Sequence, residues 1–528
     1  MTSDTTASSA PGCPVHGGRT PLYGPEFAAN PARVYDALRH HGPVAPVELA
    51  PGIPASLVIS YDAALAVLRD PRRFPKDARR WERTVPPDSP VVPFMKYRPA
   101  CNKTDGAEHA RLRAAVSDSL SRIDVNTLRD SVERHAETLI RRFAVRGAAD
   151  LRTEYALVLP LLVFNEVLGC PPEIGDRIVV AMQGFVENVD TAKSNRILLE
   201  AIGELVALKR ARPADDLTTW ILDHPARLTD EEVTEQFIPL IGLATEPEQN
   251  LIANGLRLLL SDGRFAGDLS GGSLPIDDAL DEILWTDPPI ANWAISYPVE
   301  DIEFQGVRLP ADQPVVIGFA AANTDPSTAS ANRTGNRAHL AWGAGPHTCP
   351  VQGQARMIAS VAMEKLLDAL PDMELAVPAR QLEWRPGFAQ RALKSLPVRF
   401  PPVQAPPRPT GSAADPVQAA WQSAPGHGLR QESPAPAPAW GPSSPAPPVD
   451  PYAPAAAGGP HTPPPAEDPY APTPAGNPHT PAGDPYAPAP AGSPHTSAPA
   501  GNSHASGPRP SAAPDRRRSP LSRWWRGE

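Results

Sequence analysis

A single cysteine closes a glycine-containing loop in the segment HLAWGAGPHTCP, residues 339–350. Cys349 follows Gly343, Gly345 and His347, and the helical pattern QARMIASVAMEKLLDAL comes after it. Glycines permit tight backbone turns, so that loop amides can point at the sulfur. The start of the next helix adds partial positive charge, which stabilises a thiolate. This arrangement is suited to hold a flat metal cofactor through sulfur.

The alternative for any free cysteine is a small buried hydrophobic side chain. We expect that role for Cys13, Cys101 and Cys170, which stand alone in the sequence. The four cysteines contain no CxxC pair, so neither a disulfide framework nor a structural zinc site is indicated. The chemistry therefore rests on Cys349, and the remaining sequence must position it.

The elements that would do so are mainly helical. Apolar spacing predicts helices at 30–42, through much of 107–262 and at 354–370, while residues 55–71 predict a strand followed by a helix. Thr229 and Glu232 form a capping-box pattern that opens a long apolar helix. Short strand candidates occur within 302–319. The predicted fold class is mainly α with minor β, and no GxGxxG, Walker, HExxH or GxSxG motif is present.

Proline divides the chain into a globular part and a tail. Of 70 prolines, 34 lie from Pro401 onward, where apolar residues are too sparse to form a core. We expect a disordered N-terminus over 1–20, one folded domain over 21–402, and a disordered Pro/Ala/Gly-rich tail over 403–528. The sequence shows no secretory signal or membrane-spanning run, so a cytoplasmic location is expected. The net charge of −10 argues against a nucleic-acid binder.

The tail contains repeats and a basic end. DPYAP begins at Asp450, Asp468 and Asp484, and such Pro-rich units favour extended polyproline conformation. The last thirteen residues, RRRSPLSRWWRGE, combine arginine with tryptophan. This end is either simply solvated or contacts an anionic membrane surface or an acidic protein partner.

The loop WGAGPHTC resembles the FGxGxHxC haem-ligand loop of cytochromes P450, with Gly343, Gly345, His347 and Cys349 matching. The resemblance implies the P450 fold, haem b as cofactor, and Cys349 as the axial ligand of its iron. It extends over residues 20–402 and includes EHARLRAAV, which is similar to the family's C helix. It implies that His109, Arg113 and His347 contact the haem propionates.

The chain departs from this family in four places. Where the family has ExxR, Glu282 is followed by Trp285, so Glu282 must find another partner, reach solvent or bind a proton. This ExxW variant resembles a subset of actinobacterial P450s encoded beside small-GTPase operons. Ser296 stands where an arginine usually contacts a propionate, and Val351 replaces a glycine.

The fourth departure concerns proton delivery. The family's acid–alcohol pair aligns with Glu246 and Pro247, so the acid remains and the alcohol is lost. Proline lacks an N–H, which leaves the carbonyl of Leu243 without that helical bond and able to hold a water molecule.

Two functions remain open at this point. One is a haem-thiolate monooxygenase that acts on a small organic substrate and takes electrons from a separate ferredoxin and ferredoxin reductase. The missing alcohol and arginine then predict reduced efficiency. The other is a P450-like regulatory or interaction protein with weak or no oxygenase activity, which works with GTPase-operon partners. The repeat-containing tail favours the second.

Overall fold

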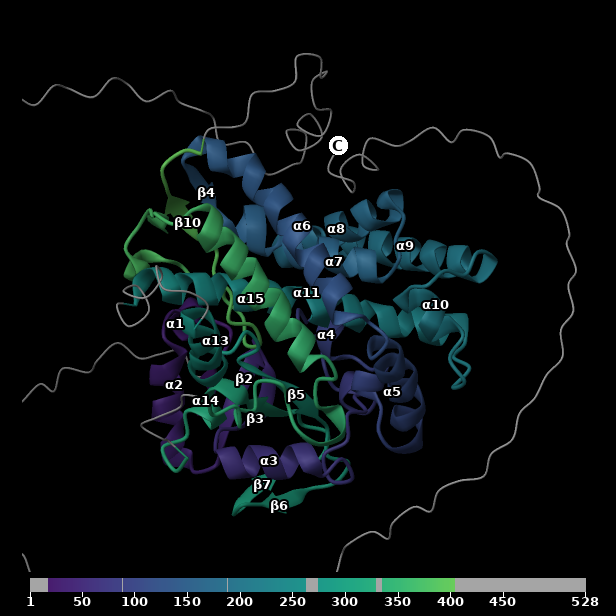
Figure 1. Cartoon of the computed structure of the whole chain (residues 1–528). Coiled ribbons are helices and arrows are strands. Elements are labelled where there is room, and N and C mark those ends of the chain that lie inside the picture. Colours follow the sequence, from purple (N-terminus) through teal and green to yellow (C-terminus); the bar gives the residue numbers. More distant parts are fainter. Residues whose placement is uncertain (1–17, 88, 188, 263–273, 329–334, 404–528) are drawn as a thin grey trace, which may run out of the picture. The chain divides into compact units, whose positions relative to one another are not determined.

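A computed structural model describes residues 18–403 except 88, 188, 263–273 and 329–334 (Figure 1). The tail repeats and the basic end lie outside the described residues, as do the first 17 positions. Thr20 already belongs to a short strand, and at the other end Val403 donates a backbone hydrogen bond to Ala144 (3.0 Å).

Helices make up most of the described residues, as the sequence predicts. Those of the first half are α1 Pro25–Ala29, α2 Pro31–Leu38, α3 Tyr61–Arg69, α4 Val92–Met95, α5 Gly106–Leu120, α6 Val125–Phe143, α7 Val158–Val167 and α8 Pro172–Glu187. Those of the second half are α9 Thr191–Ala211, α10 Leu217–Leu222, α11 Asp230–Ser261, α13 Leu274–Thr286, α14 Phe319–Asn323 and α15 Gln352–Ala369. Figure 1 shows α6 to α10 gathered on one side of α11, and α1 to α3 with most strands on the other.

In the described residues the strands are short and form three small sheets. They are β1 Thr20–Pro21, β2 Val44–Ala50, β3 Ile53–Val58, β4 Ala148–Asp150, β5 Asn292–Ser296, β6 Ile302–Phe304, β7 Val307–Leu309, β8 Val315–Gly318, β9 Glu374–Leu375 and β10 Pro397–Arg399. The largest sheet has the order β1-β2-β3-β8-β5 and combines parallel with antiparallel pairs. The sequence analysis did not predict β2, whose apolar positions do not alternate strictly with polar ones.

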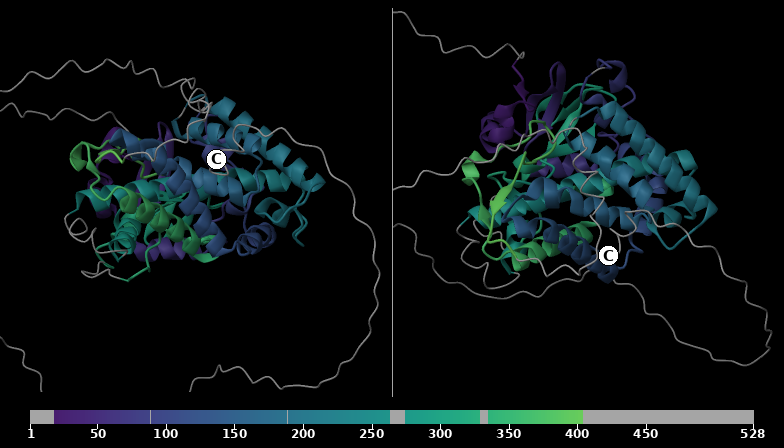
Figure 2. Two further views of the ribbon diagram at one scale, coloured as in Figure 1. Left: turned by 45° about the horizontal axis from the view of Figure 1, so that its top comes forward. Right: turned by 90° about the horizontal axis from the view of Figure 1, so that it is seen from above.

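The long helix α11 begins where the sequence predicts. Thr229 accepts a hydrogen bond from the Glu232 N–H (3.1 Å), and the Glu232 carboxylate accepts one from the Thr229 N–H (2.9 Å). The second half of α11 is almost continuously buried and packs in one core cluster with α6, α7, α13 and α15. Figure 2 shows the same helices from two other directions. A helix buried on nearly all sides fixes the position of its residues relative to the Cys349 loop.

Candidate functional site: a thiol at the edge of an apolar cavity

Local backbone geometry explains the glycines of the Cys349 loop. Gly343 and Gly345 have φ angles of +71° and +68°, a region that side chains disfavour. A Cβ atom on Gly345 would also stand 2.3 Å from the carbonyl oxygen of Leu68, at the end of α3. The Cys349 N–H donates to the carbonyl of Trp342 (2.9 Å), which closes the loop just before α15. The sequence pattern therefore positions the thiol by local turns.

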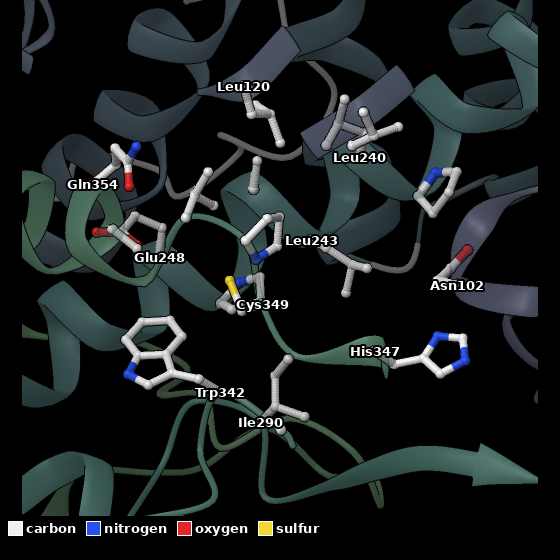
Figure 3. A pocket seen from close by; sticks show the side chains of 18 of the residues that line it. Asn102, Leu120, Leu240, Leu243, Glu248, Ile290, Trp342, His347, Cys349 and Gln354 are labelled. Atoms are coloured by element: carbon white, nitrogen blue, oxygen red, sulfur yellow. The ribbon is translucent and has the colours of Figure 1, made fainter. Parts of the chain in front are cut away.

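Cys349 lines a cavity of about 320 Å³ between this loop, α5, α11 and β5. Leucine, valine, isoleucine, phenylalanine and proline side chains form most of its wall. In the view of Figure 3, Glu248 and Gln354 lie on one side of Cys349, while His347 and Asn102 lie on the other. Cys101 lines the same cavity, so it contains two thiols at different places.

Neighbouring groups shift the pKa of the Cys349 thiol in opposite directions. Burial raises the pKa of the thiol, and the nearby Glu248 carboxyl raises it further. The backbone amide of Val351 and the Arg113 guanidinium both lower it. A cation bound to the sulfur would add to these two favourable interactions, because metals bind the thiolate form.

Helix α11 covers the cavity with one face. Pro239, Leu243 and Pro247 line it, and the helix continues through both prolines. Thr245 directs its hydroxyl to the carbonyl of Ile241 (2.8 Å) and is not among the lining residues. The only alcohol close to Pro247 along this helix segment is thus engaged within the helix.

The two acids beside Pro247 lie in different surroundings. Glu246 is about a quarter exposed, lies off the cavity wall and pairs with Arg385 (3.3 Å). Glu248 lines the cavity, is buried, and one of its carboxylate oxygens has no hydrogen-bond partner among the described residues. Burial raises the pKa of Glu248 well above its usual range. The sequence analysis singled out Glu246 and missed Glu248.

The three basic residues predicted to contact the propionates differ in the hydrogen bonds that they already make within the protein. His109 is buried and does not line the cavity, and its ring nitrogens lie 2.7 Å from the carbonyl oxygen of Cys101 and 3.3 Å from that of Pro346. Arg113 and His347 do line the cavity. Arg113 donates to Ser117 (2.7 Å) and to the carbonyl of Thr348, and His347 bonds to Asp105 (3.2 Å).

Two further cations in the wall were missed by the sequence analysis. Lys76 and Lys103 are buried and line the cavity. Burial lowers the pKa of Lys76 to about 8, although Asp105 opposes the shift. Burial and the charge of Lys76 lower the pKa of Lys103 to about 7. Neither lysine belongs to a recognisable motif, so only the folded chain brings them to the thiol.

Comparisons with known proteins decide the family. No protein-family model matches the chain. The cytochrome P450 monooxygenase PikC of Streptomyces venezuelae is 32% identical over 391 residues, which cover 71% of this chain and 92% of the relative. The chain belongs to the cytochrome P450 family. Vitamin D(3) 25-hydroxylase of Pseudonocardia autotrophica is 30% identical, with coverage of 73% and 97%. A solved myxobacterial P450, CYP267B1 in complex with myristic acid, is 28% identical with a TM-score of 0.64, with coverage of 72% and 98%.

Membership establishes a P450-type monooxygenase with haem b as its cofactor, and the predicted fold class and family are confirmed. The comparisons give no support to the regulatory alternative, and they do not bear on the narrower ExxW resemblance. No helix of the described residues is both long and apolar enough to cross a membrane.

The donor set of this P450 fits haem b. The cavity combines an apolar wall with one thiol at a loop-to-helix junction, as an iron porphyrin requires. It also contains Lys76, Lys103 and Arg113, which suit a group that carries two carboxylates. Val351, which replaces the usual glycine, lines the same cavity and packs against a neighbouring core cluster. Its bulk is therefore accommodated within the wall.

Trp285, at the position of the arginine in the family's ExxR motif, and the neighbouring acids make other contacts. Trp285 is buried and donates its indole N–H to the carbonyl of Asn336 (2.6 Å), and Glu282 also retains an interaction. One residue earlier, the buried Asp281 pairs with Arg356 of α15 (2.5 Å) and with Arg337 (3.5 Å). Asp281 thus joins helix α13 to α15 and to the segment before the Cys349 loop through ion pairs.

Proposed function

We propose that this P450 inserts one oxygen atom from O2 into an apolar organic substrate held between α11 and the Cys349 loop, where the Cys349 thiolate would bind the haem iron. The observation that carries the proposal is one cavity lined both by the Cys349 thiol and by Pro239, Leu243 and Pro247 of α11. When bound, haem supplies the activation of O2 by two electrons and two protons. The chain's own side chains bind and orient the substrate and exclude water.

The substrate class follows from the wall and from the relatives. One relative is named for vitamin D(3), and one similar structure holds myristic acid. Both molecules are large and mainly apolar. The cavity wall of this chain is mainly apolar as well. We therefore infer a mainly apolar substrate of this kind for this chain.

Electrons must come from outside the P450 domain. The four cysteines lack the spacing of an iron–sulfur site, and the sequence of the Pro-rich tail lacks the apolar content of a flavin domain. We infer a separate ferredoxin and ferredoxin reductase. Contact of the Arg/Trp-rich end with a membrane or an acidic protein stays a prediction.

Glu246 is proposed to supply protons past Pro247. It is adjacent to the lining residue Pro247 and keeps a partly exposed carboxylate beside Arg385. Water held at the Leu243 carbonyl would connect the Glu246 oxygens to the cavity. Without a hydroxyl at position 247, proton delivery should be less selective, and part of the reduced oxygen should leave as hydrogen peroxide.

The ligand assignment is tested with two matched cysteine variants. Cys349→Ala should abolish the thiolate-type spectrum that reduced P450 gives with carbon monoxide. Cys101→Ala, which removes the second thiol of the same cavity, should retain it. A normal spectrum from Cys349→Ala would refute the assignment.

The activity and the proton route are tested by balancing NADPH consumed against oxygenated product and peroxide, with ferredoxin, reductase and 18O2. Substrate-dependent incorporation of one labelled atom is expected, with substantial peroxide. Pro247→Thr should raise the ratio of product to NADPH, and Glu246→Gln should lower it. Tight coupling in the unmodified protein would show that protons reach the cavity by another route.

A further inference from the structure

Two buried lysines form a cationic wall on the cavity, and their donors are only partly used. The Lys76 ammonium donates to the carbonyl of Ala294 (2.9 Å) and to the Ser296 hydroxyl (2.9 Å). The Lys103 ammonium donates to the carbonyl of Phe94 (3.0 Å) and stands 5.6 Å from the centre of the Trp293 ring. An ammonium has three N–H donors, so within the described part of the chain one remains unused on Lys76 and two on Lys103.

Within the described part of the chain, the acids that act on these lysines do so from a distance, Asp105 on Lys76 and Glu82 on Lys103. Neither ammonium has a carboxylate within ion-pair distance there. The nearest acid of Lys76, Asp105, accepts from the Lys76 backbone N–H (2.5 Å) and from His347 (3.2 Å). Buried charges are costly unless paired, so this wall is built for an anion that the cavity receives.

Lys76 lies beside a position that usually carries a positive charge in this family. Ser296 stands where the P450 resemblance places an arginine that contacts a haem propionate. Here the Lys76 ammonium reaches the Ser296 hydroxyl from a segment 220 positions away. A positive charge is therefore present beside position 296, although residue 296 itself is neutral.

We propose that Lys76 and Lys103 bind the two propionates of haem b, and that Lys76 replaces the arginine missing at position 296. The proposal rests on the proposed function, since it requires haem in the Cys349 cavity. Figure 3 places Asn102, which precedes Lys103, on the same side of Cys349 as His347. Lys76 and Lys103 line the same cavity as Arg113 and His347, so they add two basic side chains to its wall.

The test combines lysine variants of the full holoprotein with a change in the cofactor. Rates of haem loss to an excess of haem-free globin are measured for haem b and for its dimethyl ester, which lacks the carboxylates. Lys76→Met and Lys103→Met should each speed loss of haem b about tenfold to hundredfold, the usual value of a hydrogen bond between charged groups. Loss of the dimethyl ester should hardly change.

This pairing separates propionate contact from a structural role. A lysine that only supports the fold would change the loss of both cofactors equally, and that result would overturn the proposal. Lys394→Met removes an exposed lysine paired with Glu383 and should change neither rate. Lys76→Arg should keep haem b bound as in the unmodified protein.

Relocating the charge gives a second, independent result. In the double variant Lys76→Met with Ser296→Arg, the family's usual cation returns to position 296, and slow loss of haem b should be restored. Unchanged rapid loss from a folded double variant, with its thiolate spectrum intact, would contradict replacement of the arginine by Lys76. Failure of the unmodified protein to take up haem would instead refute the proposed function.

Discussion

Lys209 and the pair Lys76 and Lys103 are equally buried, yet they lie in opposite electrostatic surroundings. Lys209 of α9 meets the buried carboxylate of Asp216, which also caps α10 by accepting from the Thr219 N–H (2.9 Å). Lys76 and Lys103 meet carbonyls and a hydroxyl. The lysine with a buried acidic partner, Lys209, joins two helices. The two lysines without one in ion-pair distance line the cavity.

The two buried arginines of the described residues are each paired with an acid, as Lys209 is. Arg152 pairs with Glu187 (2.9 Å) and Arg391 with Asp287 (2.6 Å). Of the five buried lysines and arginines, only the two at the cavity lack an acidic partner within the described part. Because chance would scatter unpaired charges over the molecule, their gathering at one wall indicates ligand binding.

The largest effect is expected from Lys209→Met. It leaves the Asp216 carboxylate buried without its cation, which typically costs about 3–5 kcal/mol of unfolding free energy. Denaturant unfolding measures the loss. The double variant Lys209→Met with Asp216→Leu should recover much of it. Equal stability of Lys209→Met and the unmodified protein would remove the contrast with the cavity lysines.

A smaller loss is expected from Asp281→Asn. The change deprives Arg356 and Arg337 of a buried anion, while Asp277 still pairs with Arg356 (3.1 Å). We expect a loss of about 2–3 kcal/mol in thermal unfolding, below the range for a pair left wholly without its partner. Asp278→Asn, at an exposed position of the same helix, is the control and should change little. An equal effect of both changes would contradict the role given to Asp281.

A pH-dependent gain is expected from Glu248→Met. Burial raises the pKa of Glu248 above its unfolded value of 4.5, so the folded chain keeps a proton that the unfolded chain releases. Stability of the unmodified protein must therefore fall as pH rises above 4.5. The variant has no ionisable group at position 248, so it does not lose this stability. Its melting temperature relative to the unmodified protein should therefore rise from pH 5 to pH 8. A constant difference between the two melting temperatures over this pH range would contradict the buried, protonated state of Glu248.

The smallest effect is expected from truncation after residue 405. The described chain ends its contacts at Val403, which bonds to Ala144. Stability should stay within about 0.5 kcal/mol, as for changes away from the core, and haem content should be unchanged. Loss of haem on truncation would show that the tail takes part in the cavity's charge balance.

Local signals were enough to predict several parts of this molecule from its sequence. Thr229 and Glu232 are three positions apart, so the start of α11 follows from capping alone. Gly343, Gly345 and Cys349 lie within one loop, and their backbone angles and order suffice to present the thiol. The mainly helical class follows from apolar spacing in the same way.

Tertiary structure alone decided which charges face the thiol. Lys76 reaches Ser296 over 220 positions, and Arg356 reaches Asp281 over 75. A lysine in a loop carries no periodicity or spacing that distinguishes a surface position from a cavity wall. Among the described residues, both lysines are buried without a carboxylate in ion-pair distance, and only the folded chain produces that combination. The proposed metal ligand therefore follows from a local pattern, whereas the proposed anion-binding wall depends on contacts between distant segments.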